Sequence, residues 1–190
     1  MIAARGLEKR FGDRRVLRGV DVDLPDEGFL LVTGRNGSGK TTLLRILAGL
    51  TSCDAGTIEL PFRAAVGYLG HEPLVYRELT PLENLSLFAR LYRVDEPGER
   101  VGMLLERFGL WAVRHDRVST FSRGMQQRLG LARVLLHDPA LLVLDEPYNA
   151  LDAEGAELLD ATLAEPRTFV VATHAPERVE PRATQRLALA

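Results

Sequence analysis

The chain has 190 residues, an apolar fraction of 46% and a formal net charge of −2, which together fit one globular domain, with or without an inserted subdomain. The near balance of charge shows no polycation for binding nucleic acid, and the single cysteine, Cys53, excludes an internal disulfide. Because no run approaches the ~20 apolar residues of a membrane helix and the N-terminus lacks a signal-peptide pattern, we expect a soluble protein of a reducing, cytoplasmic compartment.

The first third of the chain contains a phosphate-binding motif in its expected context. Residues 1–28 mix short alternating stretches with turn residues and predict a small antiparallel β region. The apolar run 29–32 predicts a buried strand, and the stretch 42–50 is helix-like. Between them, residues 34–41 read Gly-Arg-Asn-Gly-Ser-Gly-Lys-Thr, a full match to the loop that cradles phosphates in nucleotide hydrolases. This strand–loop–helix order is the context that the motif requires.

The chemistry of this loop follows from its residue types. Glycines let backbone N–H groups close around phosphate oxygens, and the following helix start adds partial positive charge. Lys40 supplies a compact cation near the β- and γ-phosphates, and Thr41 offers its hydroxyl to Mg²⁺. Lys9 and Lys40 are the only lysines of the sequence, whose other basic residues are arginines. Lysine therefore occupies the position where its compact ammonium group suits a phosphate better than the planar guanidinium group of arginine does.

The remaining elements predict a parallel α/β core interrupted by helices. Thr80-Pro81-Leu82-Glu83 is a capping box, and apolar residues follow at helical spacing. Further strands are expected over 57–60, 65–69, 141–144 and 169–173, and further helices over 98–108, 123–136 and 153–164, the last capped by Asp152 and stopped by Pro166.

The pattern as a whole predicts an α/β P-loop NTPase fold. We expect a parallel-sheet core with an N-terminal antiparallel β region and an inserted helical subdomain. The domain spans 1–190, with 1–71 and 139–190 as the catalytic core and 72–138 as the helical subdomain.

Two adjacent carboxylates end the apolar run 141–144. A buried strand delivers Asp145 to the tip of the sheet, where it can hold Mg²⁺ through water. Glu146, one residue further on, can face an attacking water. A solvated loop is the competing interpretation, and the phosphate-binding loop argues against it.

The segment Phe121-Ser122-Arg123-Gly124-Met125-Gln126-Gln127-Arg128 opens a predicted helix. With it, the set of motifs resembles the ATP-binding subunit of an ABC transporter, whose signature is usually Leu-Ser-Gly-Gly-Gln. Ser122 and Gly124 match this signature, whereas the other three positions depart from it. The resemblance implies that Ser122 and the helix N-terminus face the γ-phosphate of a second subunit. One chain then holds half of each site, and two ATP molecules lie between head-to-tail copies.

The resemblance extends over nearly the whole chain. Asn149-Ala150-Leu151-Asp152 matches the D-loop at the dimer seam, and His174 matches the switch histidine that contacts the γ-phosphate. Phe11 matches the aromatic residue that stacks on adenine, with a buried core position as the competing interpretation. The resemblance implies ATP and Mg²⁺ as cofactors, catalysis by Glu146, His174 and Lys40, metal ligation by Thr41 and Asp145, and ATP binding by Phe11, Gly34, Arg35, Asn36, Gly37, Ser38, Gly39, Lys40, Thr41, Thr42, His71, Ser122, Gly124 and Asp152.

One position departs informatively from the family pattern. Most members carry glutamine in the loop that joins core and helical subdomain, whereas this chain has Gly70-His71-Glu72-Pro73. Because imidazole is a poor match for Mg²⁺, we expect His71 to hydrogen-bond a metal-bound or attacking water and to make turnover depend on pH. This dipeptide and the Leu-Thr-Pro-Leu-Glu-Asn-Leu stretch at 79–85 are similar to the haem-exporter ATPase of the cytochrome c maturation system.

We therefore expect an ATP-hydrolysing subunit that powers a membrane ABC transporter. It would lie at the cytoplasmic face of the cell membrane, pair with itself, and drive integral membrane subunits through residues 72–90. An ATPase of a multidrug or lipid exporter and a soluble, non-transport ABC ATPase are the alternatives. A kinase or GTPase is disfavoured because the sequence has no Asn-Lys-x-Asp guanine motif and because the segment 121–128 would then have no role.

Overall fold

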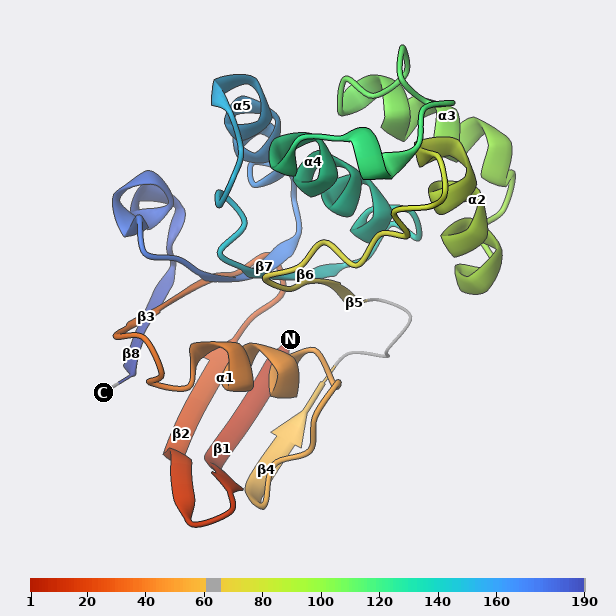
Figure 1. Ribbon diagram of the computed structural model, residues 1–190. Coiled ribbons are helices and arrows are strands. Elements are labelled where there is room, and N and C mark those ends of the chain that lie inside the picture. Colours follow the sequence, from red (N-terminus) through yellow and green to blue (C-terminus); the bar gives the residue numbers. More distant parts are fainter. Residues whose placement is uncertain (61–65, 190) are drawn as a thin grey trace. The chain divides into compact units, whose positions relative to one another are not determined.

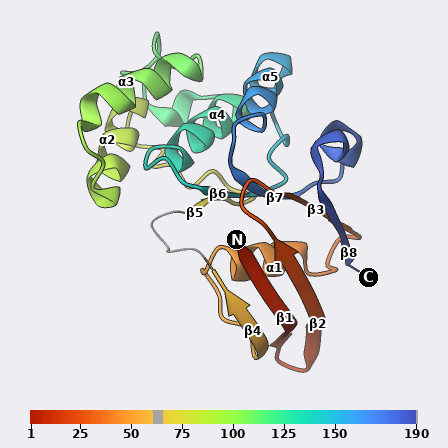
Figure 2. The ribbon, with the colours of Figure 1, turned by 180° about the vertical axis from the view of Figure 1, so that it is seen from behind.

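The structure is a computed structural model that describes residues 1–60 and 66–189 (Figure 1). The chain forms two compact units. The first unit comprises residues 1–68, 140–146 and 166–190, and the second comprises 69–139 and 147–165. Among the described residues, the first unit holds nearly all of the strand residues and the α-helix α1, whereas the second holds the other α-helices (Figures 1 and 2).

The first unit contains a small antiparallel sheet, in agreement with the prediction for residues 1–28. Its strand order is β2-β1-β4, with β1 at Ile2–Phe11, β2 at Arg14–Leu24 and β4 at Ala55–Glu59. Ile2, Ala4 and Leu7 are buried on β1 while residues between them are less so, which gives the strand one core face. Strand β4 begins before the predicted 57–60 and ends at Glu59.

The first unit also contains a second, larger sheet with parallel pairing. Its order is β5-β6-β7-β3-β8, with β5 at Val66–Leu69, β6 at Leu141–Asp145, β7 at Thr168–Ala172, β3 at Phe29–Gly34 and β8 at Gln185–Leu189. Strands β6 and β7 are buried at every residue, which explains their uninterrupted apolar runs. The predicted strand 65–69 thus begins at Val66, and Ala65 lies outside the described residues. Strand β8 was not predicted.

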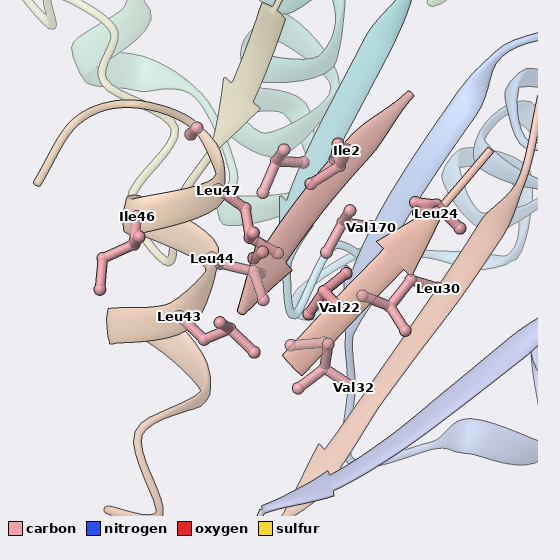
Figure 3. Packing of buried hydrophobic residues seen from close by; sticks show 14 of the residues in the cluster. Ile2, Val22, Leu24, Leu30, Val32, Leu43, Leu44, Ile46, Leu47 and Val170 are labelled. Carbon is pink, nitrogen blue, oxygen red and sulfur yellow. The ribbon is translucent and has the colours of Figure 1, made fainter. Parts of the chain in front are cut away.

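A shared core fixes helix α1, which spans Lys40–Leu47 and not the predicted 42–50, against both sheets. Leu43, Leu44 and Leu47 point from α1 toward the strands (Figure 3). They belong to one buried cluster with the labelled side chains of the antiparallel sheet and of β3 and β7, which are Ile2, Val22, Leu24, Leu30, Val32 and Val170. Burial of each such side chain stabilises the fold by roughly 1.5–3 kcal/mol. The N-terminus of α1 is therefore held rigidly where the phosphate-binding loop enters it.

The second unit consists of helices with the predicted caps. Helix α2 (Pro81–Tyr92) opens with the expected capping box: Glu83 N donates to Thr80 Oγ1 at 3.2 Å, and Thr80 N donates to Glu83 Oε2 at 2.8 Å. Helices α3 (Pro97–Arg107) and α5 (Ala153–Thr162) lie within a few residues of prediction. Helix α4 (Arg123–Val134) packs against α2, α3 and α5 (Figure 2). Within the described residues, no helix has the length and apolarity to cross a membrane.

Candidate active site

The phosphate-binding loop runs from the end of β3 to the start of α1 along a path that only glycine permits. Gly34 has φ +148°, and a Cβ there would lie 2.5 Å from the Leu189 carbonyl of β8. Gly39 has φ +103°, and a Cβ there would lie 2.9 Å from Val16 Cγ1. The loop is thus wedged between β8 and β2 with no room for side chains at these positions.

Lys40 lies across this loop. Its Nζ donates hydrogen bonds to the carbonyl oxygens of Gly34 at 2.8 Å and Arg35 at 3.2 Å. The residue is only 7% exposed, so these carbonyls compensate a cation that is largely removed from water. The loop therefore carries a fixed positive charge beside its backbone N–H groups, as a polyphosphate requires.

Thr41 and Asp145 form the second part of the site. The Thr41 hydroxyl donates to Asp145 Oδ2 at 2.6 Å, and Asp145 is 3% exposed at the end of β6. Burial raises the pKa of neighbouring Tyr68, and the negative charge of Asp145 adds to the rise.

The pair of Thr41 and Asp145 fits Mg²⁺. Hydroxyl and carboxylate oxygens are hard donors of the kind that Mg²⁺ prefers. No group of three or more His, Cys, Asp or Glu residues is placed for a metal within residues 1–60 and 66–189. A site with few protein ligands suits an ion that keeps its waters and binds substrate phosphates.

Glu146 and His174 follow neighbouring parallel strands, β6 and β7. The backbone N–H of His174 donates to Glu146 Oε2 at 2.9 Å, and His174 Nε2 lies 3.3 Å from Glu146 Oε1. Glu146 itself has φ +52° and donates its N–H to the Ala172 carbonyl at 2.8 Å. A positive φ at a residue with a side chain is strained and is frequent at functional sites. This carboxylate is therefore held in a defined orientation from which it can accept a proton.

The second unit brings together the other predicted residues around an open groove of about 1210 Å³. The groove is lined by residues of the loop 71–77, the start of α4 and the segment 149–152, and His71, Ser122, Gly124 and Asp152 are among them. Ser122 is the N-cap of α4 and accepts the N–H of Met125 at 3.2 Å. Asp152 caps α5 in the same way, accepting the N–H of Gly155 at 2.8 Å.

The loop that carries His71 is anchored to α4. A Cβ at Gly130 would lie 2.6 Å from Pro73 Cβ, so the loop approaches the helix where a side chain is absent. Arg133 Nε donates to the Pro73 carbonyl at 3.2 Å, and its guanidinium lies over the Phe88 ring. Burial lowers the pKa of Arg133, an effect that Tyr92 opposes. The sequence analysis did not identify Arg133; a basic residue on the buried face of a predicted helix was its only signal.

The structure divides the predicted site residues between the units. The first unit holds the loop 34–41, Thr42, Asp145, Glu146 and His174, and the second holds the four residues of the groove. Phe11 ends β1 in the first unit and is 56% exposed, so the competing interpretation of a buried core residue is wrong. Its stacking on adenine stays a prediction.

Comparison with known proteins supplies independent findings. The family profile described as "ABC transporter" matches residues 17–149. The uncharacterised ABC transporter ATP-binding protein YdbJ of Bacillus subtilis is 36% identical over 190 residues, which are 92% of this chain and 61% of that protein. The cytochrome c biogenesis ATP-binding export protein CcmA of Cupriavidus necator is 39% identical over 92% of this chain and 83% of its own length.

The daunorubicin resistance ATP-binding protein DrrA3 of Streptomyces coeruleorubidus is 39% identical over 84% of this chain and 55% of its own length. The chain thus spans less than two thirds of several curated relatives that it matches.

Solved structures match over the whole chain. A dimeric, post-hydrolysis ATP-binding cassette with ADP and phosphate bound matches with a TM-score of 0.86 and 25% identity, covering 100% of this chain and 94% of the other. An ATP-binding subunit of an ABC transporter matches with a TM-score of 0.88 and 25% identity, covering 100% and 85%. These matches confirm the predicted α/β fold.

Proposed function

Because this chain belongs to the ABC transporter family, we propose that it is the ATP-binding and ATP-hydrolysing subunit of a membrane transporter. The observation that carries this proposal is the arrangement in the first unit, where the loop holding Lys40 is joined by a hydroxyl–carboxylate pair and by the oriented Glu146. A phosphate cradle, a pair of hard oxygen ligands and a carboxylate for the water are the parts that phosphoryl transfer to water requires.

We assign the steps to residues as follows. Glu146 orients a water molecule and accepts its proton as the water oxygen bonds to the γ-phosphorus. The bond from phosphorus to the bridging oxygen breaks, and ADP leaves with that electron pair. Lys40 offsets the charge of the β- and γ-phosphates. The backbone N–H of His174 donates a hydrogen bond to the Glu146 carboxylate and so holds its orientation. A Mg²⁺ ion held by Thr41 and Asp145 would supply further positive charge to the phosphate oxygens.

We further propose that two copies of the chain share the reaction. Ser122 and the first turn of α4 offer a hydroxyl and a helix N-terminus, both of which favour an anion. In a head-to-tail pair these groups would face the γ-phosphate on the partner's Lys40 loop. The dimeric cassette with ADP and phosphate supports this arrangement as an analogy at 25% identity.

Membership of the family supports proposals for the membrane partners and the location. We propose that the chain binds integral membrane subunits at the cytoplasmic face of the membrane, through residues 72–90 of the second unit. The relatives named as transporter ATP-binding proteins support this assignment in general.

Haem export for cytochrome c biogenesis is the finer proposal. It is supported by the Gly70-His71 dipeptide, by the stretch 79–85 and by the similarity to CcmA. Drug export is the second candidate, because DrrA3 has the same identity of 39% over a smaller share of this chain. Capture of the tagged chain from membranes of its own organism, followed by identification of the integral protein that co-purifies, separates the two.

Phosphate release tests the ATPase itself. The purified chain should release phosphate from Mg-ATP, and Glu146→Gln should bind ATP with unchanged affinity while releasing almost none. Equal rates for wild type and Glu146→Gln would overturn the assignment of Glu146. An absence of any release from wild type, even with its membrane partner present, would overturn the ATPase.

A further inference from the structure

We propose that Gln127 is a positioning residue that holds the segment following Glu146 in its reactive conformation, an inference that rests on the proposed function. Gln127 lies on α4 and is only 5% exposed. Its Nε2 donates to the carbonyl oxygen of Pro147 at 3.2 Å. Because Pro147 directly follows Glu146 in the chain, this bond fixes the backbone on the carboxyl side of the proposed base.

The segment 146–150 needs such a restraint. Glu146 has φ +52° and Ala150 has φ +65°, both in the left-handed region that residues with side chains rarely adopt. Such conformations persist only where the surroundings hold them. Two hydrogen bonds tie the segment to other elements: Glu146 N donates to the Ala172 carbonyl at 2.8 Å, and the Tyr148 hydroxyl donates to Asp160 Oδ1 at 2.5 Å. Contacts with groups outside the segment therefore help to keep it in one conformation.

Helix α4 supplies that restraint at two points on one face. A Cβ at Gly124 would lie 2.9 Å from the Ala150 carbonyl, so only glycine lets the segment pass this close to the helix. Gln127, one helical turn later, reaches the Pro147 carbonyl. The helix thus contacts the segment at both ends, once by close approach and once by a hydrogen bond.

The chemistry of the contact requires an amide donor. A buried carbonyl that loses its partner costs free energy, because water no longer reaches it. An apolar side chain at position 127 would leave the Pro147 carbonyl unsatisfied, and a carboxylate would oppose it with a second acceptor. The neighbouring Gln126 serves a different purpose, since its Nε2 donates to the Phe121 carbonyl at the start of the same helix.

The expected kinetic effect is specific. Gln127 belongs to the second unit and the loop 34–41 to the first, so loss of the Gln127 amide should leave nucleotide binding intact and should slow the chemical step. We expect kcat for ATP hydrolysis to fall at least about tenfold in Gln127→Met and Gln127→Glu, with KM within about twofold of wild type. Amide hydrogen exchange of residues 147–152 should become faster than in wild type while that of α1 is unchanged.

Arg107→Met is the matched control in the full-length chain. In the same unit, Arg107 Nη2 at the end of α3 donates to Thr162 Oγ1 at the end of α5 at 2.8 Å and to Glu165 Oε1 just after α5 at 2.5 Å. This variant should keep more than about half of the wild-type kcat. Equal losses of kcat in the control and in the Gln127 variants would overturn the proposal, as would a kcat near wild type in both Gln127 variants.

Two further outcomes are decisive. Thermal midpoints of both Gln127 variants more than about 10 °C below that of Arg107→Met would make Gln127 a stability residue and overturn its positioning role. A wild-type chain whose phosphate release equals that of Glu146→Gln would count against the proposed function. Failure of the proposed function can be told apart from failure of the Gln127 proposal. If the wild type shows no ATPase activity, amide hydrogen exchange of residues 147–152 alone tests Gln127, and an unchanged exchange rate in the Gln127 variants overturns its positioning role.

Discussion

The hydroxyl of Thr41 is hydrogen-bonded to the carboxylate of Asp145 at 2.6 Å, although 104 residues separate them in the chain. Thr41 lies in the first turn of α1 just after β3, and Asp145 ends β6; both strands pair with β7 in parallel. The carboxyl ends of parallel strands share one edge of a sheet, where ligands of such folds bind. The topology therefore brings two distant motifs to one site.

Lys40→Ala should weaken ATP binding. Lys40 is the buried cation of the phosphate-binding loop, and its removal leaves the β- and γ-phosphates without this charge. We expect the Kd for ATP to rise by at least about tenfold, or about 1.4 kcal/mol, in a fluorescent-nucleotide titration. Arg5→Ala, which removes an exposed cation paired with Asp23, is the control. Unchanged affinity in Lys40→Ala would refute the loop assignment.

Thr41→Val should raise the Mg²⁺ requirement of ATP hydrolysis. Valine has nearly the shape of threonine but lacks the hydroxyl that faces Asp145. The Mg²⁺ concentration for half-maximal rate should rise at least about tenfold, the size of effect that loss of an outer-shell partner alone produces. Thr41→Ser keeps the hydroxyl and should stay near wild type. Identical Mg²⁺ titrations for the valine and serine variants would contradict the metal assignment.

Thr80→Ala should destabilise the second unit by about 1 kcal/mol, the usual cost of losing an N-cap side chain. The size of this destabilisation should depend on pH. The hydrogen bonds from the Thr80 backbone and side chain hold the pKa of Glu83 below its ordinary value of 4.5. Because the pKa of Glu83 is lowered by folding, the ionised Glu83 carboxylate stabilises the folded state at pH values above 4.5. This stabilisation is lost as the pH falls through the pKa of Glu83 in the folded state.

The difference in thermal midpoint between wild type and Thr80→Ala should therefore shrink on acidification. Scans at neutral pH and well below the ordinary Glu83 pKa measure it. Arg93→Ala, placed just beyond the other end of α2, serves as a control for the helix itself. A difference that grows at low pH would contradict the capping account.

His71→Gln should alter both the rate and the pH profile of ATP hydrolysis. His71 lines the groove with Ser122 and Asp152, and its imidazole can donate and accept hydrogen bonds. Glutamine places an amide oxygen at the same position and removes the imidazole. The checks are kcat measured across neutral and mildly acidic pH for both proteins. Superimposable profiles would show that His71 takes no part in turnover.

Local sequence patterns predicted most of the fold because each pattern matched its environment. The apolar run 141–144 forms a fully buried strand between β5 and β7 of the larger sheet, and the Thr80–Glu83 capping box forms with both of its hydrogen bonds. Helix ends were less predictable. Helix α4 ends at Val134 and not at 136, because the helical bonding gives way to turns: Leu135 N is shared between the Leu131 and Ala132 carbonyls, and Leu136 N donates to the Arg133 carbonyl.

The features that sequence analysis missed depend on long-range pairing. Strand β8 carries an exposed Arg186 between partly buried neighbours, and its register is set by β3, more than 150 residues away as the Phe29–Thr184 bond shows. In the sequence, nothing distinguishes Gln127 from the other polar residues of its predicted helix. Its partner is the backbone carbonyl of Pro147, and no sequence pattern pairs a side chain with a particular backbone carbonyl 20 residues away, so only the folded chain reveals the contact.

The account depends most directly on the sharing of each reaction centre between two chains. Glu146→Gln should form a dimer in saturating Mg-ATP and return to a monomer when ATP is removed, as measured by size-exclusion chromatography with light scattering. Ser122→Arg in the same background should stay monomeric, because the bulky side chain blocks the approach of the partner's γ-phosphate. A Glu146→Gln protein that binds Mg-ATP at saturation yet remains monomeric would contradict the account.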